Sequence, residues 1–385
     1  MTEYTQLEIE DPINGAVFHS LNGKRLEGGL LIDVSGKVLT SYEVYVNGVR
    51  TERKGNNFTS TVVLKGKQTE ITAISGQSRD IIRVLLDPNE ELRYSLSFDD
   101  NIFFLWDILS RGYDSLFDNF YLRELKELHD KYGAKFTLNI FYKVDERYKG
   151  TFGPFSLNQF PDKFRDEWEK NSSWLRLAFH AFSEFPNRPY RNAPLDKITQ
   201  DFDLVTKEIL RFAGSAYIPT SITHWTFMPH ETFSLLRKKG VRTLCGYFTP
   251  KKGDLAPGEL SYSTNYDLND KISRYLHEHK AVKDFDSGIV FCCLDLLFNA
   301  TPIRDIPSKL DFVMSNPKKR GVLVFSTHEQ YFWPQYKAPE SWFDGPTDKI
   351  HFRHVPYHFQ RLETGIKIAT EGGYKSVFLH ECYDL

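Results

Sequence analysis

The pattern of apolar residues changes near Arg93, and this change divides the chain into two predicted regions. Residues 11–87 hold short runs that alternate apolar and polar side chains, separated by turn formers and without a helical period. We therefore expect a small β-sandwich over residues 1–90, with a linker around residues 87–91. After Arg93, strand-like and helix-like runs alternate for the rest of the chain. This alternation predicts a mainly parallel α/β sheet over residues 91–385, either closed as a barrel or open.

Charge balance and the lengths of the apolar runs exclude several kinds of protein. The 385 residues include 49 Lys and Arg against 51 Asp and Glu, so the composition argues against a dedicated nucleic-acid or anionic-membrane binder. The longest apolar run, residues 289–294, is far too short to span a bilayer. The N-terminal stretch MTEYTQLEIEDP has no basic and apolar signal sequence. This favours a cytoplasmic protein, unless it is exported by another route or a signal has been removed.

The four cysteines predict neither a zinc finger nor a disulfide framework. Cys292 and Cys293 are adjacent in an apolar, strand-like run, and Cys245 and Cys382 complete no C-x-x-C pair. We expect them to be small buried side chains. Aromatic residues, in contrast, make up 15% of the chain, and those on loops would suit a sugar or another ring-shaped ligand.

Residues that bind metals or transfer protons follow several strand-like runs of the second region. The runs lie at residues 94–99, 135–141, 174–180, 221–227, 241–246, 288–294 and 321–328. The polar residues in or after them are Asp99 with Asp100, His180, His224 with His230, and His328. Each has a structural explanation when taken alone, such as a helix cap or a hydrogen-bonded core histidine. In a parallel barrel, however, the C-terminal ends of the strands converge, so the combination favours one active site.

The spacing His180-Ala-Phe-Ser-Glu184 indicates a metal site. In a helical turn, positions i and i+4 share a face, so the imidazole and the carboxylate could bind one cation. Together with Asp100 they would form an Asp/His/Glu site with open positions for water and substrate. Such a ligand set suits zinc, and also cobalt, nickel, manganese or iron.

These motifs resemble the polysaccharide deacetylase family, carbohydrate esterase family four, over roughly residues 93–380. SFDD (97–100) is similar to the first motif of the family, HAFSE (180–184) to the second, TFMPHETFSLLRKKGV (226–241) to the third and VLVFSTH (322–328) to the late motif. The resemblance implies a deformed (β/α) barrel of seven or eight strands. The first region loosely resembles the immunoglobulin-like modules that are often attached to bacterial carbohydrate enzymes.

The resemblance also implies roles for single residues. Asp99 corresponds to the general base, Asp100 to a metal ligand and His328 to the general acid, while His180 matches the first histidine of the second motif. His230 lies on the turn that could supply an oxyanion donor.

The sequence departs from the family at three places. Glu184 stands where the second metal-binding histidine belongs, and the fourth motif, which carries an aspartate, is not recognisable. The arginine that orients the catalytic aspartate has no counterpart, although Arg188 or His224 could replace it. Two rings after the late strand, Tyr331 and Trp333, stand where a sugar could stack, or pack in a surface loop.

The leading functional hypothesis is a metal-dependent hydrolase that removes acetyl groups from an N- or O-acetylated carbohydrate, with zinc as the expected metal. A second hypothesis is a catalytically silent barrel that binds a saccharide or a protein. A third is hydrolysis of a non-peptide C–N bond in another substrate. The sequence does not predict the oligomeric state.

Overall fold

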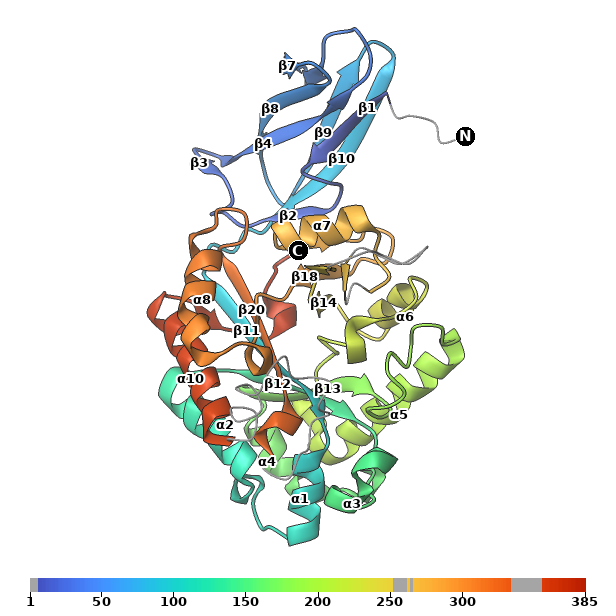
Figure 1. The fold of residues 1–385 in the computed structure, drawn as a ribbon, viewed down its shortest axis with the longest axis vertical. Coiled ribbons are helices and arrows are strands. Elements are labelled where there is room, and N and C mark those ends of the chain that lie inside the picture. Colours follow the sequence, from blue (N-terminus) through green and yellow to red (C-terminus); the bar gives the residue numbers. More distant parts are fainter. Residues whose placement is uncertain (1–5, 252–261, 264–265, 334–354) are drawn as a thin grey trace.

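The first ten strands form a two-layered β-structure at one end of the molecule (Figure 1). The computed structural model describes residues 6–251, 262–263, 266–333 and 355–385. The strands are β1 (Leu7–Asp11), β2 (Ala16–Phe18), β3 (Lys24–Leu26), β4 (Gly29–Val38), β5 (Tyr45–Val46), β6 (Val49–Arg50), β7 (Glu52–Lys54), β8 (Asn57–Leu64), β9 (Gln68–Ser75) and β10 (Ser78–Leu86).

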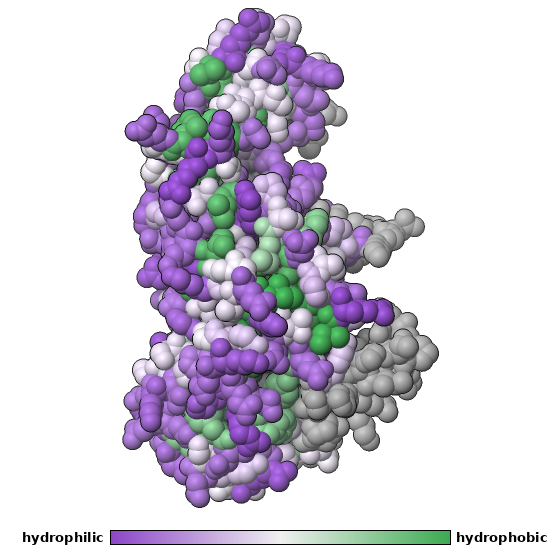
Figure 2. All heavy atoms as spheres, turned by 90° about the vertical axis from the view of Figure 1, so that its left-hand side faces the viewer, coloured by the Kyte–Doolittle hydropathy of each residue, from purple (hydrophilic) through white to green (hydrophobic). Residues whose placement is uncertain are grey.

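Alternation of apolar and polar residues explains how the two layers pack. Along β4, Leu30, Ile32 and Val34 are buried, and the residues between them are more exposed. One layer has the order β1-β4-β8-β7 with β3 beside β4, and the other contains β2-β10-β9-β5-β6. The buried side chains lie between the layers. The face shown in Figure 2 is accordingly dominated by hydrophilic side chains, with apolar ones in small separate groups.

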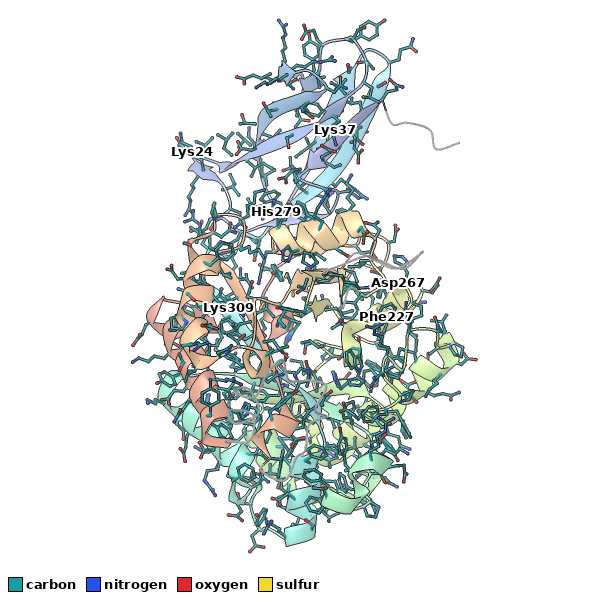
Figure 3. The ribbon with its side chains drawn as sticks, viewed as in Figure 1. Lys24, Lys37, Phe227, Asp267, His279 and Lys309 are labelled. Carbon is teal, nitrogen blue, oxygen red and sulfur yellow. The ribbon has the colours of Figure 1, made fainter. Side chains whose placement is uncertain are left out.

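The second layer does not end at the boundary between the two regions. Strand β2 pairs in parallel with β10 and antiparallel with β17 (Ala281–Lys283), so that Val17 lies opposite Ala281. Through β17 the sheet continues into β18 (Val290–Cys293) and β14 (Thr243–Gly246), giving eight strands. His279, just before β17, lies with its Nε2 3.4 Å from Asp11 Oδ1 (Figure 3). Backbone hydrogen bonds therefore connect the two regions directly.

The predicted linker is held by a buried ion pair. The guanidinium of Arg93 donates to the carboxylate of Asp87, and both side chains are 1% exposed. Arg93 also donates to the carbonyls of Asn89 and Glu91, so it fixes the backbone of the connecting segment. Removing one partner of such a pair would leave an uncompensated buried charge, so both residues are needed to hold the connecting segment.

The second region alternates strands and helices, as predicted. Its strands are β11 (Arg93–Asn101), β12 (Phe136–Phe141), β13 (Leu175–Ala181), β14, β15 (Thr249–Pro250), β16 (Tyr262–Ser263), β17, β18, β19 (Leu296–Leu297), β20 (Val322–His328) and β21 (Lys375–Ser376). Its helices are α1 (Phe103–Arg111), α2 (Phe120–Tyr132), α3 (Lys149–Phe152), α4 (Arg165–Lys170), α5 (Leu195–Ala213), α6 (Thr232–Lys238), α7 (Asp270–Glu278), α8 (Ile306–Ser315) and α10 (Val355–Glu371). Two 3₁₀ helices, η6 (His224–Thr226) and η9 (Glu329–Phe332), flank the cavity described below.

A parallel sheet with the order β13-β12-β11-β20-β19 forms the centre of this region, and β21 pairs with β11. An irregular segment, residues 217–222, joins it to the eight-stranded sheet: Ile218 N–H donates to Leu177 O of β13, and Cys245 N–H of β14 donates to Ser221 O. On the other side, Asp295 N–H donates to Val324 O of β20. The central sheet is thus connected to the β14-β18 end of the eight-stranded sheet on both of its sides.

The predicted mixed α/β architecture with a largely parallel sheet is confirmed. Closure into a barrel of seven or eight strands, the immunoglobulin-like class of the first region and the domain boundary at residues 90 and 91 stay predictions. Within the described part of the chain, no helix combines the length and the apolar character needed to cross a membrane.

Gly15 provides a test of the connection between the regions. Its φ is +86°, and a Cβ at this position would lie 2.1 Å from the Lys283 carbonyl oxygen of β17. Gly28 has nearly the same φ, +84°, but a Cβ there meets no atom within 4 Å. Both Gly15→Ala and Gly28→Ala should lose about 1–2 kcal/mol from left-handed strain. Gly15→Ala should lose about 1–3 kcal/mol more because of the backbone overlap. Urea unfolding of both variants measures the difference, and equal destabilisation would contradict this close approach.

Candidate metal centre and active site

The candidate site lies where the C-terminal ends of the central strands meet. Asp99 of β11 and His328 of β20 are register partners in adjacent parallel strands. The register of β11 against β12 shifts between Phe98 and Asn101, and Asp100 lies within this irregularity with φ +61°. A non-glycine residue with such a backbone is strained and is enriched at functional sites. The irregularity breaks the simple alternation of β11, and Asp99 and Asp100 both line one cavity.

Three ligand atoms from different elements converge in this cavity. The Nε2 atom of His180, at the end of β13, lies 3.0 Å from Asp100 Oδ1. The Nδ1 atom of His224, from η6, lies 3.1 Å from the same oxygen and 3.2 Å from His180 Nε2. All three residues are buried, and their ligand atoms lie within 4.8 Å of one another. Two imidazoles and one carboxylate in this geometry are a donor set for a divalent transition metal.

In each of the two histidines, the ring nitrogen that points away from Asp100, here called the outer nitrogen, shows where the ring carries a proton. His180 Nδ1 lies 2.9 Å from the carbonyl oxygen of Ile222, and His224 Nε2 lies 2.9 Å from that of Glu184. A carbonyl oxygen only accepts hydrogen bonds, so these outer nitrogens carry the protons. In the neutral rings the inner nitrogens then present lone pairs to each other and to Asp100. A cation between them would remove this repulsion, and carbonyl acceptors behind metal-binding histidines are the usual supporting contacts.

The third member of the cluster is His224, whereas the sequence predicted Glu184 as the third ligand. The Glu184 side chain lines the cavity but is not one of the three clustered ligands, and its backbone carbonyl supports His224 instead. Burial, and then the charge of Asp100, raise the pKa of Glu184 well above its usual value. Burial alone would also raise the pKa of Asp100, but when the imidazoles of His328, His224 and His180 are protonated, their charge and hydrogen bonds bring it well below its usual value. The carboxylate that is ionised at the cluster is therefore Asp100.

Asp99 is held by neutral donors. The Asn139 side-chain amide donates to Asp99 Oδ1 at 2.6 Å, and the Ser326 hydroxyl donates to Oδ2 at 2.9 Å. Ser221, from the irregular segment, donates in turn to Asn139 Oδ1. Arg188, one of the predicted substitutes for an orienting arginine, instead lies on an exposed turn. Two hydrogen bonds fix the Asp99 carboxylate at the cavity wall, and no residue in the described ranges forms an ion pair with it.

His328 and Gln330 complete this side of the cavity. His328 Nδ1 lies 2.9 Å from Asn299 Oδ1, and its Nε2 lies 3.9 Å from Asp100 Oδ2. If Asn299 accepts from Nδ1, then Nε2 is the nitrogen available to the cavity. The Gln330 amide donates to Asp100 Oδ2 at 2.7 Å, which directs Oδ1 of that carboxylate to the two histidines. His328 thereby faces the cluster without belonging to it.

The cavity has a volume of about 420 Å³, and most of its wall is apolar. Its remaining lining residues are Ile222, Trp225, Thr226, Cys245, Gly246, Tyr247, Leu294, Leu297 and Tyr331. Tyr331, which the sequence proposed as a substrate contact, is among these lining residues. Trp333 does not line the cavity: it is 3% exposed, and its indole N–H donates to Glu329. His230 is exposed and packs against Phe233, outside the lining of the cavity. The predicted substrate contacts of Trp333 and His230 thus receive no support from this geometry.

The loop that carries His224 is strained and anchored. Trp225 and Thr226 follow it with φ +60° and +47°, two consecutive left-handed residues that are costly for non-glycine side chains. Tyr266 holds this loop, because its N–H donates to Thr226 O at 2.8 Å and its hydroxyl donates to Cys245 O of β14 at 2.8 Å. The backbone therefore turns sharply where the third clustered ligand is presented.

Glu329, which the sequence did not indicate, connects the site to helix α1. Its carboxylate accepts hydrogen bonds from the backbone N–H groups of Ile102, Phe103 and Phe104, which begin the helix. The helix has no side-chain cap of its own, so Glu329 supplies one from a distant part of the chain. Burial raises the pKa of Glu329 to about 7, while the hydrogen bonds from these N–H groups act in the opposite direction.

The raised pKa of Glu329 predicts a pH-dependent contribution to stability. The folded protein holds this proton more tightly than the unfolded chain, so the contribution is greatest below pH 4.5 and is lost as the pH rises to about 7. Glu329→Gln removes this titration. The unfolding free energy of the wild type minus that of the variant should therefore fall by on the order of 3 kcal/mol from pH 4.5 to 7.5. Urea unfolding across this range measures it. A constant difference would show that the helix N–H groups keep Glu329 ionised throughout.

Comparisons with known proteins give only distant similarities. No family model and no curated protein matches the chain. Among solved structures, a CE4 esterase from Streptococcus mutans shares 12% identity with a TM-score of 0.36, covering 75% of this chain and 87% of that one. A CE4 family pseudoenzyme from Bacillus anthracis shares 12% identity with a TM-score of 0.35, covering 78% and 67%. A 4-alpha-glucanotransferase from Thermococcus litoralis shares 12% identity with a TM-score of 0.39, covering 76% and 40%. Similarity this distant identifies neither a family nor a function for this chain.

Proposed function

We propose that the protein is a metal-dependent hydrolase that removes an acetyl group from an N- or O-acetylated carbohydrate. The observation that carries the proposal is the cluster of Asp100, His180 and His224, whose lone pairs face one another in a cavity beside a second carboxylate, Asp99. The motif resemblance points to the same chemistry. It also leads us to propose a deformed deacetylase-type barrel for residues 91–385 and an immunoglobulin-like module for residues 1–90.

The atoms that converge in the cavity suggest which metal ions it would bind and through which residues. Two nitrogens and one oxygen suit zinc first, and cobalt, nickel, manganese or iron as well. When bound, such an ion lowers the pKa of a coordinated water and polarises an acyl carbonyl. We assign Asp100, His180 and His224 as its ligands. Glu184 becomes a neutral neighbour that supports His224 through its backbone.

Protons would move through the two residues that face the cluster from adjacent strands. Asp99 is the proposed general base, because its carboxylate is fixed by Asn139 and Ser326 and lines the cavity without belonging to the ligand group. His328 is the proposed general acid, because Nε2 faces the cavity and could protonate the leaving amine or alkoxide. The apolar wall around Leu294 and Tyr331 would receive the acyl group and the sugar ring and exclude water.

Metal content tests the ligand assignment. Asp100→Ala, His180→Ala and His224→Ala should each lose the bound ion, because three protein ligands leave little redundancy. Glu184→Gln should keep it, since this variant preserves the side-chain shape and the backbone carbonyl behind His224. Elemental analysis of the purified proteins after incubation with zinc gives the stoichiometry. Loss of the ion in Glu184→Gln with retention in His224→Ala would restore Glu184 as the third ligand.

Acetate release tests the reaction and the roles of the two proton-transfer groups. Asp99→Asn and His328→Ala should each reduce kcat by about 10²- to 10⁴-fold while zinc content stays at the wild-type level. Acetylated oligosaccharides are assayed beside linear and cyclic amides. Hydrolysis of the amides alone would favour the C–N hydrolase, and zinc-free protein without any turnover would favour a silent binding barrel. Equal activity of Asp99→Asn and wild type would refute the assignment of the base.

A further inference from the structure

A turn that begins at the candidate site carries two arginines that form no ion pair with any residue in the described part of the chain. It follows Glu184, whose carbonyl supports His224, and it includes Arg188 and Arg191 as exposed residues. Tyr190 anchors the turn from below, because it is fully buried and its hydroxyl donates to Asp201 while accepting from the Phe182 N–H. These contacts of Tyr190 hold the backbone of the turn between the two arginines.

Both guanidinium groups lie over aromatic rings next to the cavity. The Arg188 guanidinium carbon lies 5.9 Å from the centre of the Trp225 ring, and Trp225 lines the cavity. The Arg191 guanidinium carbon lies 5.0 Å from the centre of the Phe227 ring, two residues further along the same loop. Figure 3 shows Phe227 next to α6. Arg188 thus lies over a residue that lines the cavity, and Arg191 lies over one that does not; we call the turn with these two arginines the rim of the cavity.

No acidic side chain among the described residues pairs with the positive charge of Arg188 or Arg191. Within the described residues, neither Arg188 nor Arg191 forms an ion pair, whereas Lys197 nearby is paired with Asp201 at 2.8 Å. A surface groove of about 400 Å³ runs over the turn, and its described lining contains these three basic residues but no acidic one. Arg188 also adopts φ +55°, a left-handed backbone that an arginine occupies at a cost. Unpaired guanidinium groups in a groove bind carboxylate, phosphate or sulfate oxygens well.

We propose that Arg188 and Arg191 bind an anionic group carried by the substrate, adjacent to the acyl group that is removed. The substrate class is thereby narrowed to an acidic saccharide, one that bears a carboxylate, phosphate or sulfate. This inference rests on the proposed function of the cavity. The anion lies outside the cavity on the rim, so it selects the substrate and takes no part in the bond cleavage.

The test compares an acidic and a neutral acetylated oligosaccharide of equal length. The acidic probe alternates a uronic acid with an N-acetylhexosamine, and the neutral probe is an N-acetylglucosamine oligomer. Calorimetry on the zinc-loaded wild type should give at least about tenfold tighter binding of the acidic probe at low salt, and the preference should shrink as salt is added. Arg188→Ala/Arg191→Ala should abolish the preference and leave binding of the neutral probe unchanged. Arg123→Ala, which removes an exposed arginine of α2, should preserve it.

Turnover gives an independent readout. Acetate release should show a KM that rises about tenfold or more for the acidic probe in the double variant, with kcat, zinc content and Tm unchanged. Equal binding of the two probes by wild type, or a preference that survives in the double variant, would overturn the inference. Binding of inorganic phosphate as tight as that of the acidic probe would also overturn it, because the turn would then be a site for a free anion. If neither probe releases acetate, the proposed function fails, while the calorimetry still decides whether the rim recognises acidic saccharides.

Discussion

The structure depends on β11, the strand that holds the centre of the parallel sheet. All nine of its residues are buried, and it pairs with β12, β20 and β21. Its first residue, Arg93, closes the connection to the sandwich, and its last residues carry Asp99 and Asp100 into the cavity. The backbone hydrogen bonds of one strand therefore set the distance between the support at one end and the reactive groups at the other. Displacement of β11 by one register position would separate Asp99 from His328.

The buried charges at the end of β11 constrain one another. Asp99 accepts hydrogen bonds from an amide and a hydroxyl, Asp100 accepts one from Gln330 and faces two imidazoles, and Glu184 is driven towards its neutral form. Two ionised carboxylates in a buried, partly apolar cavity are costly unless positive charge compensates for them. A divalent cation would supply that compensation. With its charge compensated in this way, Asp99 could remain in the cavity, close enough to the metal site to accept a proton.

Sequence analysis located four of the central side chains because they obey a simple rule. Asp99, Asp100, His180 and His328 all stand at ends of parallel strands, and the structure brings them into one cavity. The proximity of His224 to Asp100 and His180 was missed because residues 221–227 were predicted as a strand, whereas they form an irregular segment and a strained 3₁₀ turn. Glu184 was favoured because a helical turn was assumed after His180. The chain instead leaves β13 in a loop, where the i and i+4 positions do not share a face.

Sequence patterns also showed the strands of the first region but not their continuation into the second. Strands β2 and β17 have three residues each, too short for an alternating pattern. The supporting roles of Asn139, Ser326 and Asn299 were not predicted, although Ser326 lies within VLVFSTH, since a hydrogen bond between distant strands leaves no spacing signal. Gln330 and Glu329, directly after His328, were the ones that adjacency could have suggested.

Three consecutive residues, the last of β20 and the first two of η9, serve three different elements. His328 faces the cavity, Glu329 caps helix α1 and Gln330 holds the carboxylate of Asp100. Each side chain points in its own direction because η9 rotates the backbone by a fixed step per residue. The length of this turn is consequently as constrained as its composition. An insertion or deletion of one residue here would leave every side chain chemically intact and still disconnect a helix, a carboxylate and an acid from one another. Homologous chains that keep this site should therefore vary in sequence around η9 far more readily than in the number of residues it contains.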